Sequence, residues 1–156
     1  MNYFGFTHFN NSTYEENKNY KKRNKYKCIY GVPKCISSKT PYESNIYVFE
    51  MNNEINELMG IGKITNYPRL DKKYKIYDEQ NYNRYIYIGN EHITRDTLLM
   101  YENGIEIVNY FDNKLFKGTK HRKRGQGIGI IENNYYIENS INYLDKIIVL
   151  FKTINK

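Results

Sequence analysis

The stretch that decides the fold runs from Ile46 to Ile64 and reads Ile46-Tyr47-Val48-Phe49-Glu50-Met51, then Asn52-Asn53-Glu54, then Leu58-Met59-Gly60-Ile61-Gly62-Lys63-Ile64. The first part has apolar residues at both odd and even positions, which is typical of a strand buried on both faces. The polar residues in between predict a hairpin loop, and the second part predicts a return strand. Its two glycines allow another group to approach the backbone closely. We therefore expect Ile46–Met51 to pair antiparallel with Leu58–Ile64.

Two short motifs flank this pair. Tyr30-Gly31-Val32-Pro33 precedes it as a tight turn, and Tyr67-Pro68-Arg69 follows it. In this order, the pieces resemble the front half of a PUA-like domain of the EVE/YTH group, over roughly residues 26–116. The resemblance implies an α+β fold, a small PUA-like mixed β-barrel of five or six strands with flanking helices. At 156 residues, the chain is expected to form one domain, residues 1–156.

Other elements follow from periodicity and from end signals. Loose alternation predicts a first strand over Asn2–Phe9, and Arg84–Ile88 alternates clearly enough to be another strand. Capping-box spacing predicts a helix over Tyr14–Arg23. A second helix is expected from Thr94 to Tyr101, with Asn103-Gly104 ending it. A C-terminal helix is expected from an apolar stripe of Ile137, Ile141, Leu144, Ile148 and Phe151.

The charge balance indicates an anionic partner. The formal net charge is +7, and nucleic acid is the commonest anionic partner because each neutralised phosphate releases a counterion. The alternative is that an AT-rich genome alone explains the many lysines. A basic cluster of Lys120, Arg122, Lys123 and Arg124 leads into a glycine-rich run, Gly125–Gly129, in which backbone amides and cations can reach phosphates. We expect phosphate contacts from Arg84, Lys120, Arg122, Lys123 and Arg124, the alternative being an ordinary turn with solvated charges.

The resemblance also implies a pocket in which aromatic side chains hold a flipped base, often a methylated one, while polar groups read its edge. Stacking of this kind contributes about 1–3 kcal/mol per base. The candidate walls are Tyr30, Phe49, Tyr85 and Tyr87, and Asn52 or Asn53 is the candidate amide. Pockets of this group usually use tryptophan, which this chain lacks. The alternative is that these aromatic residues fill the core of the barrel.

Catalytic, metal and cofactor sites find little support in the sequence. Cys28 and Cys35 have no histidine at ligand spacing, and we expect them to be reduced thiols of an intracellular protein. The glycine-rich run lacks the Lys-Ser/Thr ending of a P-loop, and the carboxylates are dispersed. No apolar stretch approaches the roughly 20 residues of a membrane span, so no membrane partner is expected.

The function that these features favour is non-catalytic nucleic-acid binding, with RNA ahead of DNA and a modified base as the specific ligand. The alternative is a basic structural or packaging protein that binds nucleic acid or a larger assembly through the same lysines and arginines, without a pocket.

Overall fold

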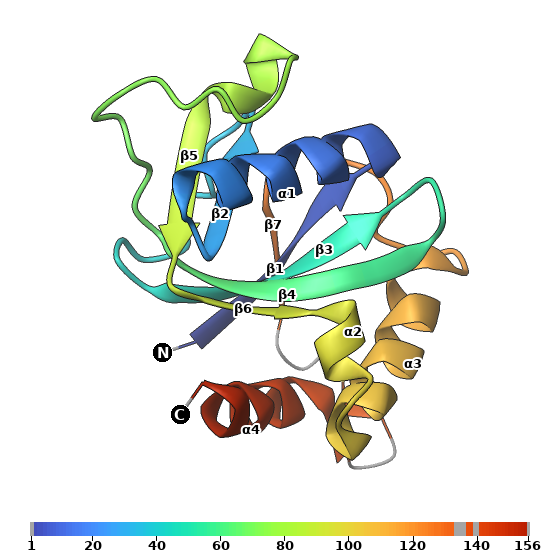
Figure 1. The fold of residues 1–156 in the computed structure, drawn as a ribbon. Helices are drawn as coiled ribbons and strands as arrows, with labels where there is room; N and C mark the ends of the chain where they lie inside the picture. The colour runs from blue at the N-terminus through green and yellow to red at the C-terminus, as the bar shows by residue number, and fades with distance from the viewer. Residues whose placement is uncertain (1, 133–136, 139–140, 156) are drawn as a thin grey trace.

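A five-stranded mixed sheet forms the centre of the molecule (Figure 1). The computed structural model describes residues 2–132, 137–138 and 141–155. The strand order is β6-β4-β3-β1-β7, and β1 runs parallel to β3 while the other neighbours are antiparallel. The strands are β1 (Asn2–Phe9), β3 (Asn45–Asn52), β4 (Glu57–Thr65), β6 (Glu91–Thr94) and β7 (Gly129–Ile131). The predicted antiparallel pairing of Ile46–Met51 with Leu58–Ile64 is confirmed, with a register shift between Glu50 and Met51.

One face of this sheet is covered by a second, two-stranded sheet and a helix (Figure 1). The second sheet pairs β2 (Cys28–Val32) with β5 (Tyr85–Gly89), and the helix is α1 (Asn11–Asn24). The two sheets approach closely at glycines. A Cβ added to Gly62 would lie 2.4 Å from the Cys28 sulfur, and one added to Gly89 would meet the Lys63 carbonyl oxygen. The close approach predicted for the return strand is therefore made by β2 of the same chain.

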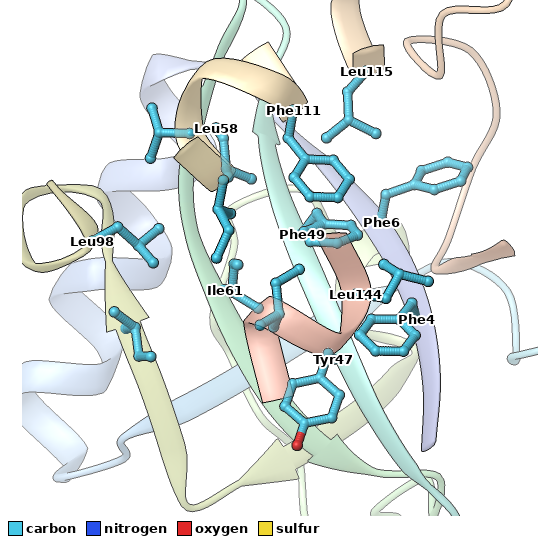
Figure 2. Packing of buried hydrophobic residues seen from close by; sticks show 14 of the residues in the cluster. Phe4, Phe6, Tyr47, Phe49, Leu58, Ile61, Leu98, Phe111, Leu115 and Leu144 are labelled. Atoms are coloured by element: carbon cyan, nitrogen blue, oxygen red, sulfur yellow. The ribbon is translucent and has the colours of Figure 1, made fainter. Parts of the chain in front are cut away.

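The opposite face of the sheet is covered by helices. They are α2 (Arg95–Leu98), α3 (Glu102–Phe116) and α4 (Tyr143–Ile154). Phe111 of α3 lies 4.4 Å, centroid to centroid, from the ring of Phe49, and Figure 2 shows this packing. Because successive side chains of β3 alternate between faces, Tyr47, Phe49 and Met51 enter this core, whereas Ile46 and Val48 enter the core beneath β2 and β5.

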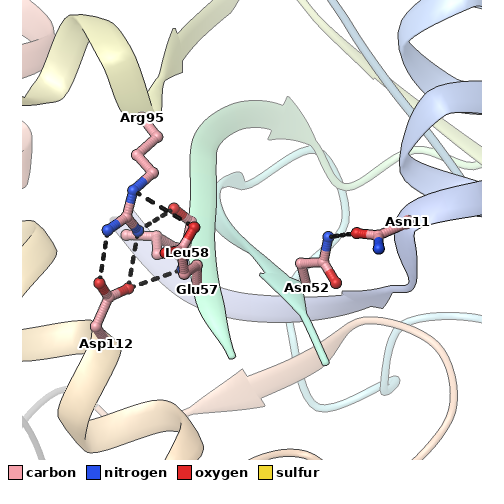
Figure 3. A network of polar contacts seen from close by, with 6 residues as sticks. All are labelled: Asn11, Asn52, Glu57, Leu58, Arg95 and Asp112. Atoms are coloured by element: carbon pink, nitrogen blue, oxygen red, sulfur yellow. Dashed lines mark hydrogen bonds and ion pairs between the residues drawn. The ribbon is translucent and has the colours of Figure 1, made fainter. Parts of the chain in front are cut away.

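A bidentate ion pair connects α2 and α3 to the start of β4 (Figure 3). The Arg95 guanidinium donates to both carboxylate oxygens of Asp112, at 3.0 and 2.9 Å, and to the Leu58 carbonyl oxygen at 2.9 Å. The Leu58 amide donates in turn to Asp112 at 2.8 Å. Because both charged groups are mostly buried and several hydrogen bonds satisfy them, this contact fixes the helices more firmly than a surface ion pair does.

Three predicted helix ends are wrong. Helix α1 begins earlier than expected because Asn10 is its N-cap and forms a capping box with Thr13. Gly104 lies inside α3 and does not end α2, and its missing side chain admits the Leu98 carbonyl, which would lie 1.8 Å from an added Cβ. Helix α4 begins at Tyr143, because β8 (Ile137–Glu138) and β9 (Ile141–Asn142) form a short pair before it.

The remaining short elements also differ in part from expectation. The strand predicted at Arg84–Ile88 is present one residue later as β5, and the 3₁₀ helix η1 (Gln80–Asn83) precedes it. Although Gly89 and Asn90 connect β5 to β6, the two strands pair in different sheets and do not form a hairpin. The α+β class is confirmed. Hydrogen bonds in the described part of the chain do not close a barrel, which stays a prediction.

Candidate functional site

A hollow of about 280 Å³ opens where several loops and strand ends meet. This volume is close to the lower limit for small-ligand pockets, about 300 Å³, and suits one flat heterocycle. We call it the tyrosine hollow. The end of β1, the start of α1 and the β3–β4 loop contribute Thr7, His8, Phe9, Asn10, Thr13 and Asn53. The end of β2 with the residue after it, the loop before β5 and the glycine-rich run contribute Gly31, Val32, Pro33, Tyr77, Tyr82, Gly125, Gln126 and Gly127.

Two tyrosines form the aromatic wall of the tyrosine hollow. The rings of Tyr77 and Tyr82 pack edge to face, with centroids 6.2 Å apart and an interplanar angle of 87°. Tyr77 is buried, and its hydroxyl accepts a hydrogen bond from the Asn17 amide at 3.0 Å. Tyr82 is 40% exposed, so part of its ring is accessible for stacking.

Gly31 makes this wall possible. A Cβ at that position would lie 2.5 Å from the Tyr82 carbonyl oxygen and 3.2 Å from the Tyr77 ring. Since real Cβ atoms do not approach a backbone oxygen so closely, a larger residue would push the loop outward. The tight turn predicted at Tyr30-Gly31-Val32-Pro33 is wrong, because Tyr30, Gly31 and Val32 pair with β5 as part of β2 and the chain bends only after Val32. As a strand residue, Gly31 therefore sets the position of both tyrosines.

The basic segment, residues 118–127, reaches the tyrosine hollow at Gly125–Gly127 and is held through its backbone carbonyls. His8 Nε2 lies 2.6 Å from the Arg122 carbonyl oxygen, and His8 Nδ1 lies 3.2 Å from that of Gly125. The Asn53 amide donates to the Lys123 carbonyl oxygen at 3.0 Å. Each ring nitrogen of His8 thus lies within hydrogen-bond distance of one backbone carbonyl oxygen of the segment. These contacts fix the segment without using its cationic side chains.

Three of the predicted pocket residues lie in packed cores. Phe49 is fully buried against α3 (Figure 2). Tyr30 and Tyr87 are buried on the other side of the sheet, where the Tyr30 hydroxyl donates to Glu50 at 2.5 Å and the Tyr87 hydroxyl accepts from the Ile36 amide at 3.0 Å. Because the sheet separates Phe49 from both tyrosines, the structure does not bring these residues together as walls of one pocket.

The other predicted residues lie nearer to the tyrosine hollow. Asn53 lines it, whereas Asn52 is buried and donates to the Asn11 side chain at 2.9 Å (Figure 3). Tyr85 is half-buried and pairs with Val32, which lines the hollow. The Arg84 guanidinium lies 5.6 Å from the centre of the Tyr85 ring, in a cation–π contact.

The predicted phosphate ligands other than Arg84 belong to the basic segment. Lys120 and Arg124 are exposed, and Arg122 and Lys123 are half-buried. None of these four residues lines the tyrosine hollow, whose lining from this segment is Gly125, Gln126 and Gly127; Lys123 and Arg124 directly precede Gly125 in the sequence.

The structure adds site residues that the sequence did not reveal. Tyr77 and Tyr82 lie in a polar segment whose sequence has no regular period. His8 is the residue before the last in β1, and the alternating sequence of that strand predicted only a strand. The sequence feature that could have indicated them is the unusual number of tyrosines, 18 in the chain. That number does not show which tyrosines line a pocket and which fill the core.

A buried polar network lies between the two sheets. Glu50 accepts hydrogen bonds from Tyr30 and, at 2.8 Å, from His92. Burial raises the pKa of Glu50, but the charge of His92 and the hydrogen bonds from His92 and Tyr30 outweigh it and lower the pKa to about 2. Burial raises the pKa of the Cys28 thiol to about 12 and that of Tyr30 well above its usual value. Cys28 is therefore protonated and a poor nucleophile.

The cysteines and metal-binding side chains carry no further site in the described residues. Cys28 and Cys35 are free thiols, the first buried and the second exposed. Across residues 2–132, 137–138 and 141–155, no three His, Cys, Asp or Glu side chains cluster as metal ligands.

Comparisons of the chain with protein-family models, with curated proteins and with solved structures gave no match. Within the described part of the chain, every helix is too short or too polar to cross a bilayer.

Proposed function

We propose that this protein binds single-stranded nucleic acid without catalysis, placing one base in the tyrosine hollow and the adjoining phosphates on the basic segment. RNA is the favoured strand type and a modified base the favoured ligand. The observation that carries the proposal is that two tyrosines, Tyr77 and Tyr82, and the glycine-rich end of the basic segment, Gly125–Gly127, line one space of about 280 Å³.

The aromatic wall supplies the stacking surface that a flipped base needs. A base that leaves its stack loses about 1–3 kcal/mol, and the exposed part of the Tyr82 ring replaces that contact. Two side-chain amides line the space and read the polar edge of the base, Gln126 and the Oδ1 of Asn53, whereas His8, Asn10 and Thr13 already make hydrogen bonds within the chain.

The charges beside the hollow favour the phosphates that remain outside. The chain carries a formal net charge of +7, and Lys123 and Arg124 lie directly before Gly125. Gly125 and Gly127 have φ angles of 109° and 79°, which glycine adopts without strain. The segment can thus turn sharply and still present cations beside the base.

We further propose that the two sheets form an open PUA-like barrel. Three contacts between β2–β5 and the large sheet support this arrangement: Tyr30 to Glu50, Cys28 against Gly62, and Gly89 against the Lys63 carbonyl. In a barrel of this kind, the tyrosine hollow lies at the end of the strands, where β1 and β2 leave the core.

The test compares Tyr82→Ala with Tyr42→Ala. Tyr42 is 68% exposed and lies outside the tyrosine hollow, so it controls for the loss of an exposed tyrosine. Fluorescence anisotropy measures binding to labelled single strands of about ten nucleotides, RNA and DNA, each with and without one methylated base. We expect Tyr82→Ala to lose about 1–3 kcal/mol of binding, roughly 5- to 150-fold, and Tyr42→Ala to change affinity less than about twofold. Thermal unfolding of both variants should stay close to wild type.

Equal effects of the two substitutions on every strand would contradict the base pocket. If affinity also followed salt concentration alone and ignored base identity, the packaging alternative would replace the proposal, because phosphate contacts carry no sequence information.

A further inference from the structure

We propose that the hydroxyl of Thr7 reads the polar edge of the base that enters the tyrosine hollow. This inference rests on the proposed function and deepens it: the ligand is a flat ring that also carries a hydrogen-bonding edge, and stacking alone does not select it. Thr7 lines the tyrosine hollow and is 5% exposed.

The side chain of Thr7 points toward the hollow because of its place in β1. Successive side chains of a strand point to opposite faces of the sheet, so Thr7 shares a face with Phe9. The Phe9 ring lies 6.4 Å, centroid to centroid, from the ring of Tyr30 in β2. Thr7 therefore faces the β2 side of the sheet, from which Gly31 and Val32 line the hollow.

The Thr7 hydroxyl has no hydrogen-bond partner in the described part of the chain. A buried hydroxyl is normally paired, and leaving it unpaired costs free energy that a ligand recovers when it supplies the partner. Glu50, directly opposite Thr7 on β3, also has an oxygen without a partner among these residues, but this Oε1 is enclosed by protein and lies over Gly60 of β4. A ligand in the hollow can thus reach Thr7 but not Glu50.

Other polar side chains at the hollow are occupied or solvated. Both ring nitrogens of His8 contact backbone carbonyls of the basic segment. Asn10 and Thr13 bond to each other in the capping box of α1. Gln126 is exposed, so water competes for its amide. Thr7 is both buried and unpaired, and a base edge that reaches it meets little competition from water.

A hydroxyl selects for the presence of a polar edge. It accepts a hydrogen bond from an N–H group and donates one to a carbonyl oxygen or a ring nitrogen. Every natural base carries such groups, whereas an apolar ring of the same shape would leave the hydroxyl unpaired. Thr7 should therefore favour a base over its apolar isostere.

The test uses strands of about ten abasic ribose–phosphate units with a single base at the centre, so that one known base can enter the hollow. That base is either thymine or difluorotoluene, which has nearly the shape of thymine and stacks but lacks its N–H and carbonyl groups. A third strand is abasic throughout. Fluorescence anisotropy gives the three affinities, and the edge ratio is the affinity for the thymine strand divided by that for the difluorotoluene strand.

Four variants isolate the hydroxyl. Thr7→Val removes it and keeps the shape of the side chain, whereas Thr7→Ser keeps it. Thr7→Ala also lacks the hydroxyl and takes the place of Thr7→Val if circular dichroism shows that Thr7→Val is unfolded. The control is Thr40→Val, at a threonine that is 6% exposed and does not line the hollow.

We expect wild type to have an edge ratio of about ten and Thr7→Val to have one about fivefold smaller, as the loss of one hydrogen bond predicts. Thr7→Ser and Thr40→Val should stay within about twofold of the wild-type ratio. The melting temperature of Thr7→Val should equal or exceed that of wild type, because the hydroxyl has no partner in the described chain. A merely structural role of Thr7 would lower stability and leave the ratio unchanged.

An edge ratio near one in wild type, with both bases bound more tightly than the abasic strand, would overturn this inference and still support the proposed function. A wild-type ratio in Thr7→Val would also overturn it, because another group would then read the edge. If wild type does not distinguish the three strands, no base enters the hollow, and both the proposed function and this inference are wrong.

Discussion

Replacement of Glu50 by glutamine should remove a pH-dependent part of the stability of this protein. Glu50 is 1% exposed and accepts hydrogen bonds from Tyr30 and His92. Its pKa is lowered from an ordinary 4.5 to about 2, because His92 and Tyr30 together overcome the effect of burial. A carboxyl group with a lowered pKa stabilises the folded state above its unfolded pKa. That stabilisation disappears as the pH falls from about 4.5 to about 2.

The size of the effect follows from the difference in proton affinity. Each tenfold difference corresponds to about 1.4 kcal/mol, so the change from 4.5 to about 2 amounts to roughly 3 kcal/mol of unfolding free energy. Glutamine has nearly the same shape but does not titrate. We expect Glu50→Gln to be less stable than wild type at pH 6 and to approach wild-type stability at pH 2.

Urea unfolding followed by circular dichroism at several pH values measures this difference. The other carboxylates titrate in both proteins, so the difference between the two curves reports Glu50. If the two free energies of unfolding fall in parallel from pH 6 to pH 2, Glu50 is not a stabilising ionised group, and the network between the sheets has been misinterpreted.

Three further substitutions separate core from site. Phe49→Ala should lower the free energy of unfolding in urea by about 3–5 kcal/mol and leave the oligonucleotide affinity of the folded protein unchanged, since Phe49 packs against α3. A loss of oligonucleotide affinity without a loss of stability would show that Phe49 belongs to the pocket. Gly104→Ala should lower the melting temperature, because the new Cβ meets the Leu98 carbonyl. Replacing glycine by alanine in a helix interior otherwise increases stability by about 1 kcal/mol. A higher melting temperature would therefore show that the helix can shift. His8→Phe keeps an aromatic ring but removes both contacts to the carbonyl oxygens of residues 122 and 125. We therefore expect faster amide hydrogen exchange in the basic segment and about tenfold weaker oligonucleotide binding. Unchanged exchange would show that His8 does not hold the segment.

The central strand pair could be predicted from the sequence because its signals are local. Apolar residues on both faces of Ile46–Met51 require a cover on each side, and the short polar loop leaves an antiparallel return as the simplest connection. The two glycines of the return strand indicated a close approach, but the approaching group, β2, comes from about 30 residues earlier in the chain. Local pattern thus identified the contact surface without identifying its partner.

The candidate pocket could not be predicted because it depends on which sheet each aromatic residue joins. Alternation along β3 places Phe49 and Val48 on opposite faces of the sheet, but the sequence does not reveal which of these two faces packs against β2. The sequence therefore allowed Tyr30 and Phe49 to line one pocket, whereas the topology places them on opposite faces of the large sheet. The ends of helices are equally hard to predict from local sequence, as Gly104 shows. Next to Asn103 it has the local signature of a helix stop, but it lies within α3, where the Leu98 carbonyl of α2 packs against it.

The position of the site follows from how completely the large sheet is covered. One face of its central strands packs against α3 and α4, and the other packs against β2 and β5. Side chains on these strand faces are therefore occupied by the cores, and a ligand must be bound by strand ends and loops. The tyrosine hollow is built in this way, from the end of β1, the end of β2 and the segment that ends at Gly127. Substitutions on the strand faces should consequently change stability, whereas substitutions in these loops should change binding.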